Sequence, residues 1–119
     1  MIVIYHNPES EDSNKCLEIL ETSKHNHEII KYQDKPLDQI KLQKIIKVLN
    51  VSPIEIIRTN DSLWKEKFQH LIDSGVEFSE KEYIEIMIEY PELIERPIII
   101  NGQKAVIGKP PKKIFEIIS

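Results

Sequence analysis

The spacing of apolar residues divides the chain into short strand-like runs and longer helical segments. Apolar runs typical of strands occur at residues 2–5 and around Ile29 and Ile30, within residues 27–32. In most of the remaining chain up to residue 90, apolar residues recur every three or four positions, which indicates helices with one buried face. The helices predicted in this way cover residues 12–23, 36–50, 61–73 and 79–90, and a last helix begins at Pro110-Pro111.

Residues at the predicted helix starts have the side chains that such positions favour. Asp12 or Ser13 is the expected N-cap of the first helix, because either side chain can accept a hydrogen bond from the backbone of the following turn. The segments Ser52-Pro53-Ile54-Glu55 and Ser79-x-x-Glu82 have the pattern of capping boxes, and Pro53 suits the first helical position.

After residue 97 the hydrophobic pattern returns to that of strands. The runs Ile98-Ile99-Ile100 and 103–107 flank Asn101-Gly102. This pair predicts a β-hairpin with a type I′ turn, because Asn and Gly tolerate the positive φ angles of that turn. The last helix is expected to bury its apolar side, which consists of Ile114, Phe115, Ile117 and Ile118.

The predicted elements follow one another in the order βαβ, several helices, and then ββα. A βαβ unit gives two parallel strands through a right-handed crossover, and the final hairpin adds two antiparallel strands. We therefore expect an α/β fold with a four-stranded mixed sheet and flanking helices. At 119 residues the chain is expected to form a single domain, 1–119, with the helices of about 36–90 as an inserted subdomain. Length and pattern alone leave another α/β sandwich open.

Composition narrows the classes of function. The formal net charge is −4 and no dense cluster of Lys and Arg occurs, so we expect no binding to nucleic acid by charge. The first residues follow a strand pattern without the features of a signal peptide, and no apolar run approaches the ~18 residues that span a bilayer. A cytoplasmic location without membrane association is therefore expected. The single cysteine, Cys16, cannot form an internal disulfide. The acidic and histidine residues lack the regular spacing of metal ligands, so no metal site is expected.

Four segments carry a resemblance to a known family. In chain order they are His6-Asn7-Pro8, Ile57-Arg58-Thr59-Asn60, the run from Tyr90 to Ile98 that contains Glu95-Arg96-Pro97, and Gly108-Lys109-Pro110. They resemble the His-Asn-Pro-x-Cys, Leu-Arg-x-Asn, Pro-x-Leu-x-x-Arg-Pro-Ile and Arg-Pro segments of the glutaredoxin-coupled arsenate reductase family. The resemblance runs from end to end of the chain, and it implies a thioredoxin-like fold.

The resemblance also implies roles for particular residues. In this family a cysteine thiolate attacks arsenate, three arginines hold the oxyanion, and glutathione with glutaredoxin completes the reduction. Two of the arginine roles fall to Arg58 and Arg96, and Lys109 stands where the family has the third. Ser10 stands at the position of the nucleophilic cysteine. The bond before Pro97 is implied to be a cis peptide bond. No bound cofactor is expected, and glutathione would be a co-substrate of an active protein.

The absence of a thiol at Ser10 decides the expected chemistry. A serine hydroxyl needs an adjacent base to become a nucleophile, and His6 is the nearest candidate in the sequence. Even an activated serine could not form the As–S and S–S bonds that the reduction requires. The remaining thiol, Cys16, lies in the second turn of the first helix, where the effect of the helix dipole fades. We expect it to be packed like a small apolar residue.

Three functions are open from the sequence. The first is an oxidoreductase of the arsenate reductase family that acts with glutathione or glutaredoxin, and the second is a binding or regulatory module for an unidentified protein partner. The third is a redox sensor that uses Cys16 alone. We expect the chain to lack arsenate reductase activity of its own. If it does act, Arg58, Arg96 and Lys109 would hold the anion, with Ser10 and His6 at its centre.

Overall fold

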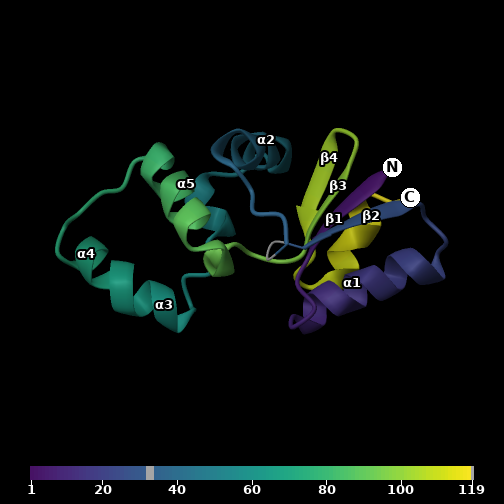
Figure 1. The fold of residues 1–119 in the computed structure, drawn as a ribbon, viewed down its shortest axis with the longest axis horizontal. Coiled ribbons are helices and arrows are strands. Elements are labelled where there is room, and N and C mark those ends of the chain that lie inside the picture. Colours follow the sequence, from purple (N-terminus) through teal and green to yellow (C-terminus); the bar gives the residue numbers. More distant parts are fainter. Residues whose placement is uncertain (32–33, 119) are drawn as a thin grey trace.

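The computed structural model of the chain describes residues 1–31 and 34–118 (Figure 1). The molecule is elongated, with dimensions of 48 × 25 × 25 Å. The strands are β1 (Ile2–His6), β2 (His27–Lys31), β3 (Ile98–Asn101) and β4 (Lys104–Ile107). The α-helices are α1 (Glu11–Thr22), α2 (Gln39–Leu49), α3 (Ser62–Trp64), α4 (His70–Asp73) and α5 (Glu80–Glu89). Within the described residues, no helix has the length and apolar character needed to cross a membrane.

The strands form one four-stranded mixed sheet in the order β2-β1-β3-β4, which confirms the predicted α/β architecture. β1 and β2 are parallel, with Ile4 opposite Ile29. β3 is antiparallel to both of its neighbours, so that Ile99 lies opposite Ile4 on one side and opposite Val106 on the other. The central pair, β1 and β3, therefore consists of a βαβ strand and a hairpin strand.

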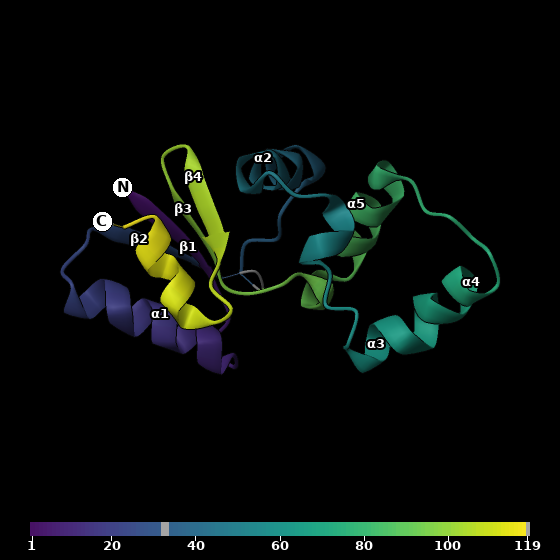
Figure 2. The same ribbon diagram turned by 180° about the vertical axis from the view of Figure 1, so that it is seen from behind.

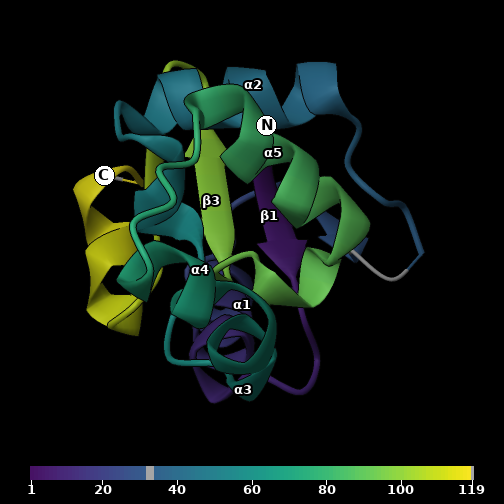
Figure 3. The ribbon, with the colours of Figure 1, turned by 90° about the vertical axis from the view of Figure 1, so that its left-hand side faces the viewer.

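The alternation of side chains along the strands divides the core into two layers. Ile4 and Ile99 face α1 and the 3-10 helix η4 (Pro111–Glu116), where they pack with Cys16 and Leu20. Residues that alternate with them, such as Tyr5, belong to a second core under α2 and α5. Figures 1 and 2 show α1 and the C-terminal turn on one side of the sheet and α2 on the other, and the end-on view of Figure 3 agrees.

The helices between β2 and β3 extend the molecule away from the sheet, with α3 and α4 at the far end (Figure 1). α3 and α4 are joined by a π-helical segment, η2 (Lys65–Gln69), so the predicted helix over 61–73 is a continuous helical run with an irregular middle. Trp64 is fully buried there, and the centroids of the Trp64 and Phe68 rings are 5.1 Å apart. The aromatic and aliphatic side chains of these helices join the core that reaches the sheet through Tyr5 and Ile98.

The predictions for the second helix, the hairpin turn and the C-terminal helix are each wrong in one respect. The second helix begins at Gln39 rather than at Pro36, because the Asp38 side chain accepts a hydrogen bond from Lys41 N at 2.8 Å and so caps the helix.

The hairpin turn is also displaced by one residue. Asn101 still pairs with Lys104, and Gly102 alone of the turn residues has a positive φ, of 63°. A turn with Gly at its first central position and a positive φ only there is of type II′ rather than type I′.

The third error concerns the C-terminal helix, whose predicted apolar side included Phe115. The segment Pro111–Glu116 is a 3-10 helix, so residues three apart in sequence lie on the same side. Ile114 and Ile117 are accordingly buried, whereas Phe115 is 57% exposed. The second strand is confirmed from His27 to Lys31, and its predicted last residue, Tyr32, lies outside the described residues.

Candidate functional site

One end of the sheet brings together the segments that the sequence analysis selected. β1 ends there at His6, and β3 begins beside it, since Ile98 lies opposite Tyr5. β4 ends at the same edge, because Ile107 lies opposite Ile98. The loop to Ser10, the Arg96–Pro97 bond and Lys109 therefore leave the sheet at one edge. The Arg96–Pro97 bond is cis, as the family resemblance implied, and the Lys109–Pro110 bond, for which we had no such expectation, is also cis.

The loop between β1 and α1 is held by its own polar groups. Asn7 accepts a hydrogen bond on Oδ1 from Glu9 N at 2.9 Å, and its carbonyl oxygen accepts one from Ser10 N at 3.0 Å. The Asn14 side-chain amide donates to the Pro8 carbonyl at 2.8 Å. These bonds fix the backbone of the loop up to the first turn of α1, which is where a reactive side chain would need to be positioned.

Ser10 is the N-cap of α1, which corrects the expectation that Asp12 or Ser13 takes that place. Its backbone is extended, and its Oγ accepts a hydrogen bond from Ser13 N at 3.2 Å. Ser10 competes well for this role because its short hydroxyl reaches a backbone N–H that would otherwise lack a partner. The hydroxyl thus stabilises the helix start in this structure.

His6 makes its hydrogen bond to Ser13 and not to Ser10. His6 Nδ1 is paired with Ser13 Oγ, which also accepts a hydrogen bond from Asn7 N at 3.0 Å. Both His6 and Ser13 are buried, and burial, followed by the positive charge of Lys31, lowers the pKa of the His6 imidazole. Burial therefore disfavours the charged form of His6, and its hydrogen bond to Ser13 joins the end of β1 to the first turn of α1. The structure does not show a His6–Ser10 pair that would activate the Ser10 hydroxyl.

Cys16 is fully buried between α1 and the C-terminal segment. Its thiol lies 3.7 Å from each of two carbonyl oxygens, those of Gly108 and Pro111. Burial, with a smaller contribution from the carboxylate of Asp12, raises the pKa of the Cys16 thiol to about 12. A thiol with this pKa is protonated at neutral pH and is a poor nucleophile.

The predicted cationic residues do meet, and carboxylates accompany them. Arg58 forms an ion pair with Asp61 at 3.0 Å, and its Nε lies 3.9 Å from Glu95 Oε1. Lys109 Nζ lies 3.9 Å from the same Glu95 oxygen. The guanidinium groups of Arg58 and Arg96 both donate to the carbonyl oxygen of Glu92, at 3.0 and 3.3 Å.

Backbone pairing places these side chains in register. Ile57 and Ile94 form an isolated antiparallel bridge. Next to it, Arg58 N donates to the Leu93 carbonyl at 2.7 Å and Glu95 N donates to the Ile56 carbonyl at 2.8 Å. This pairing fixes Arg58 and Glu95 on neighbouring segments that are far apart in the sequence.

A small polar cavity of about 150 Å³ opens beside this pairing. We call it the Arg58–Lys109 pocket, and its lining consists of Ile57, Arg58, Thr59, Asn60, Asp61, Glu95 and Lys109. It has room for a ligand of a few heavy atoms. Two of the three predicted anion-binding residues line it, while Arg96, Ser10 and His6 do not. Sequence reasoning missed Asp61 and Glu95, because a carboxylate near an arginine in sequence is usually a solvated surface group.

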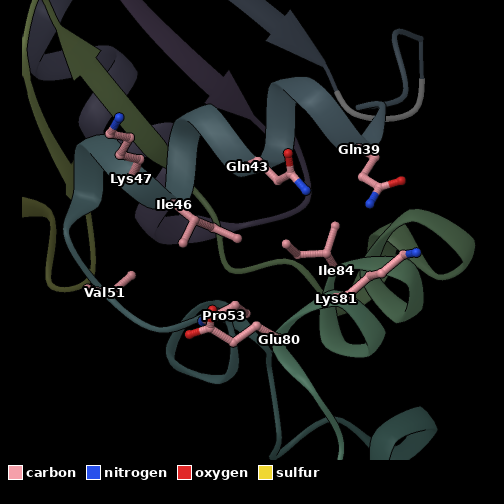
Figure 4. A pocket seen from close by; sticks show the side chains of 9 residues that line it. All are labelled: Gln39, Gln43, Ile46, Lys47, Val51, Pro53, Glu80, Lys81 and Ile84. Carbon is pink, nitrogen blue, oxygen red and sulfur yellow. The ribbon is translucent and has the colours of Figure 1, made fainter.

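A larger groove of about 430 Å³ lies elsewhere, between α2 and α5 (Figure 4). Ile46 of α2 and Ile84 of α5 point toward one another across it, and Gln39 and Gln43 lie along its α2 side. The groove shares no lining residue with the Arg58–Lys109 pocket. Among residues 1–31 and 34–118, no three His, Cys, Asp or Glu side chains are grouped so that they could hold a metal ion.

Comparison with known proteins gives one consistent result. A model of the ArsC family matches residues 5–117. The chain is 36% identical over 118 residues to a Haemophilus influenzae protein named arsenate reductase, covering 98% of each chain. It is equally 36% identical to the Escherichia coli protein YfgD, which is described as uncharacterized, over 98% of this chain and 96% of YfgD. The solved structure titled arsenate reductase from Vibrio cholerae superposes with a TM-score of 0.87 at 30% identity, over 98% of this chain and 97% of that one.

Proposed function

The chain belongs to the ArsC family, and from that premise we propose that it is a redox-silent member, which keeps the fold for binding and does not itself reduce arsenate. Membership connects it with proteins named arsenate reductases, whose reaction class is a reduction. The observation that carries the proposal is the environment of Ser10. Its hydroxyl caps α1 at the loop position where the family resemblance calls for a thiol.

The chemistry of the reduction supports this proposal. Arsenate must gain two electrons, and in a thiol-dependent route these come from sulfur, first through an As–S bond and then through formation of an S–S bond. An oxygen nucleophile at Ser10 can supply neither step. His6, the nearest base in sequence, is bonded to Ser13 and has a pKa lowered by burial. The loop thus lacks both the sulfur and a paired base for Ser10.

The redox-sensor alternative finds no support in the surroundings of Cys16. A sensor thiol needs access to oxidant and a substantial thiolate fraction. Cys16 has 0% exposure, and burial raises its pKa to about 12. We propose that it fills space between α1 and η4.

Binding of a protein partner is the role that we propose for the retained fold. Glutaredoxin or glutathione would be partners of an active reductase, and a redox-silent protein has no need of either as an electron source. Two of the three cations that would attract an oxyanion, Arg58 and Lys109, are already engaged by Asp61 and Glu95, which favours a binding role over turnover.

The deciding experiment is arsenate-dependent oxidation of NADPH in the glutathione, glutaredoxin and glutathione reductase couple. The parent chain should be silent, and the Haemophilus influenzae relative serves as the positive control for the coupling system. Arsenate-dependent activity in the parent that disappears in Cys16→Ala would overturn the proposal and assign the chemistry to Cys16. The Ser10→Cys variant adds the missing thiol, so its activity reports whether the rest of the site still accepts arsenate.

A further inference from the structure

A single carboxylate oxygen is shared by the two cations that line the Arg58–Lys109 pocket. Glu95 Oε1 lies 3.9 Å from Arg58 Nε and 3.9 Å from Lys109 Nζ. The Glu95 side chain is only 19% exposed, so it is held largely within the protein. A bound oxyanion would place its own oxygens near the same two cations.

The position of Glu95 is built into the backbone. Glu95 N donates to the Ile56 carbonyl at 2.8 Å, immediately beside the Ile57–Ile94 bridge. Arg58 is fixed from its other side by Asp61 and by the carbonyl oxygen of Glu92, each at 3.0 Å. The guanidinium therefore has a defined place that does not depend on Glu95 alone.

The charges that line the pocket balance. Arg58 and Lys109 supply two positive charges, and Asp61 and Glu95 supply two negative charges. A tetrahedral dianion that entered would approach the Glu95 carboxylate at the distance of an ion pair, where repulsion in a partly buried site is strong. A pocket that selects oxyanions would instead carry an excess of positive charge.

We propose that Glu95 is a specificity-determining residue that closes the Arg58–Lys109 pocket to oxyanions by occupying their place as a resident carboxylate. This inference rests on the proposed function in one respect: it takes the protein to be one that does not reduce arsenate and therefore has no need to bind an oxyanion in this pocket. Removal of the Glu95 charge turns the pocket into a binding site for small tetrahedral anions such as inorganic phosphate, sulfate or arsenate.

The test is calorimetric titration of inorganic phosphate, and then of arsenate, into the parent, Glu95→Gln and Glu92→Gln at low ionic strength. Glu92→Gln is a matched control, because it changes the net charge equally in the same segment. The contact of Glu92 with Arg58 and Arg96 runs through its backbone carbonyl, which the substitution keeps. Glu95→Gln should bind phosphate at least about tenfold more tightly than the parent, and Glu92→Gln should behave like the parent.

A second variant links the gain to the pocket. Glu95→Gln combined with Lys109→Gln should lose the gain, because one of the two cations is then gone. Glu95→Ala, also titrated, keeps the test decisive if the glutamine variant unfolds, and urea denaturation identifies which variants are folded.

Three results would overturn the inference: parent binding as tight as that of Glu95→Gln, an equal gain in Glu92→Gln, or no gain in a folded Glu95 variant. The titration involves no electron transfer. Reduction of arsenate by the parent would therefore refute the proposed function, whereas absence of a gain in a folded Glu95 variant would refute this inference and leave the proposed function standing.

Discussion

Replacement of Gly108 by alanine should destabilise the protein through a collision that can be located atom by atom. An ideal Cβ at Gly108 would lie 2.5 Å from Cys16 Sγ, 2.8 Å from Pro97 Cγ and 2.9 Å from Ile99 Cδ1. All three distances are shorter than van der Waals contact, and the three side chains belong to buried residues, one on α1 and two at the start of β3. The structure must therefore shift in several places to admit one methyl group.

The expected magnitude follows from two opposing effects. Overpacking of a well-packed core costs about 1–3 kcal/mol. Gly108 lies outside the left-handed backbone region, so alanine can adopt its conformation and should recover about 0.4–1 kcal/mol by restricting the unfolded chain. Because the methyl group would meet three close contacts, we expect the cost of overpacking to lie in the upper part of the range of about 1–3 kcal/mol. After the gain from restricting the unfolded chain is subtracted, the free energy of unfolding should fall by about 2 kcal/mol.

Urea denaturation of Gly108→Ala, Cys16→Ala and the double variant measures this effect as a double-mutant cycle. Cys16→Ala removes the atom with the shortest contact, so the double variant should be more stable than the sum of the single changes predicts, by about 1 kcal/mol. A Gly108→Ala protein within about 0.5 kcal/mol of the parent would refute the packing argument. Strictly additive single changes would show that Cys16 is not the obstructing side chain.

Three other predictions concern the loop and the buried thiol. In the native protein Cys16 should fail to react with Ellman's reagent until urea unfolds the chain. Because its pKa is raised to about 12, the stability that the protonated thiol contributes should be full below about pH 8.5 and should be lost as the pH rises toward 12. Cys16→Ala should not show this loss. The pKa of His6 is lowered, so the stability that its neutral ring contributes should be full above about pH 6.5 and should fall in more acidic solution. Between about pH 7 and pH 5, His6→Gln should therefore lose less free energy of unfolding than the parent. Equal losses in the two proteins would contradict this account of His6. Ser10→Ala should lower the free energy of unfolding by about 0.5–2 kcal/mol in urea, whereas Ser10→Asp, which can still cap α1, should retain most of it; equal losses in both would show that the cap is unimportant.

The fold could be predicted from the sequence because local and long-range signals agree. Short apolar runs, helical periodicity and the Ser79 capping box each occur where the structure has the corresponding element. The errors arose where two local signals competed. Pro36 and Asp38 both suit a helix start, and the Asp38 side chain caps α2. Asn101 and Gly102 both suit positive φ, and pairing of Asn101 with Lys104 leaves it in the strand.

The candidate site was less predictable, since its decisive contacts join distant segments. The family resemblance selected Arg58 and Lys109, and the structure shows both at one pocket. No pattern in the sequence indicates that Glu95 lies between them, because that contact depends on the Ile57–Ile94 bridge and on the loop after β4. Likewise, the sequence places His6 near Ser10, but the bond to Ser13 depends on the geometry of the first turn of α1.

Each group that the resemblance connects with catalysis has an intramolecular partner in this fold. The Ser10 hydroxyl accepts a backbone N–H, and the cations of the pocket share Glu95. An intramolecular partner needs no translational entropy to bind, so a dilute oxyanion competes with Glu95 at a disadvantage. A thiol introduced at position 10 would supply the missing sulfur, but Glu95 would still be paired with the cations of the pocket. The proposed lack of reductase chemistry and the proposed closure of the anion pocket therefore rest on separate physical features, so that a redox assay tests the first and a binding assay tests the second.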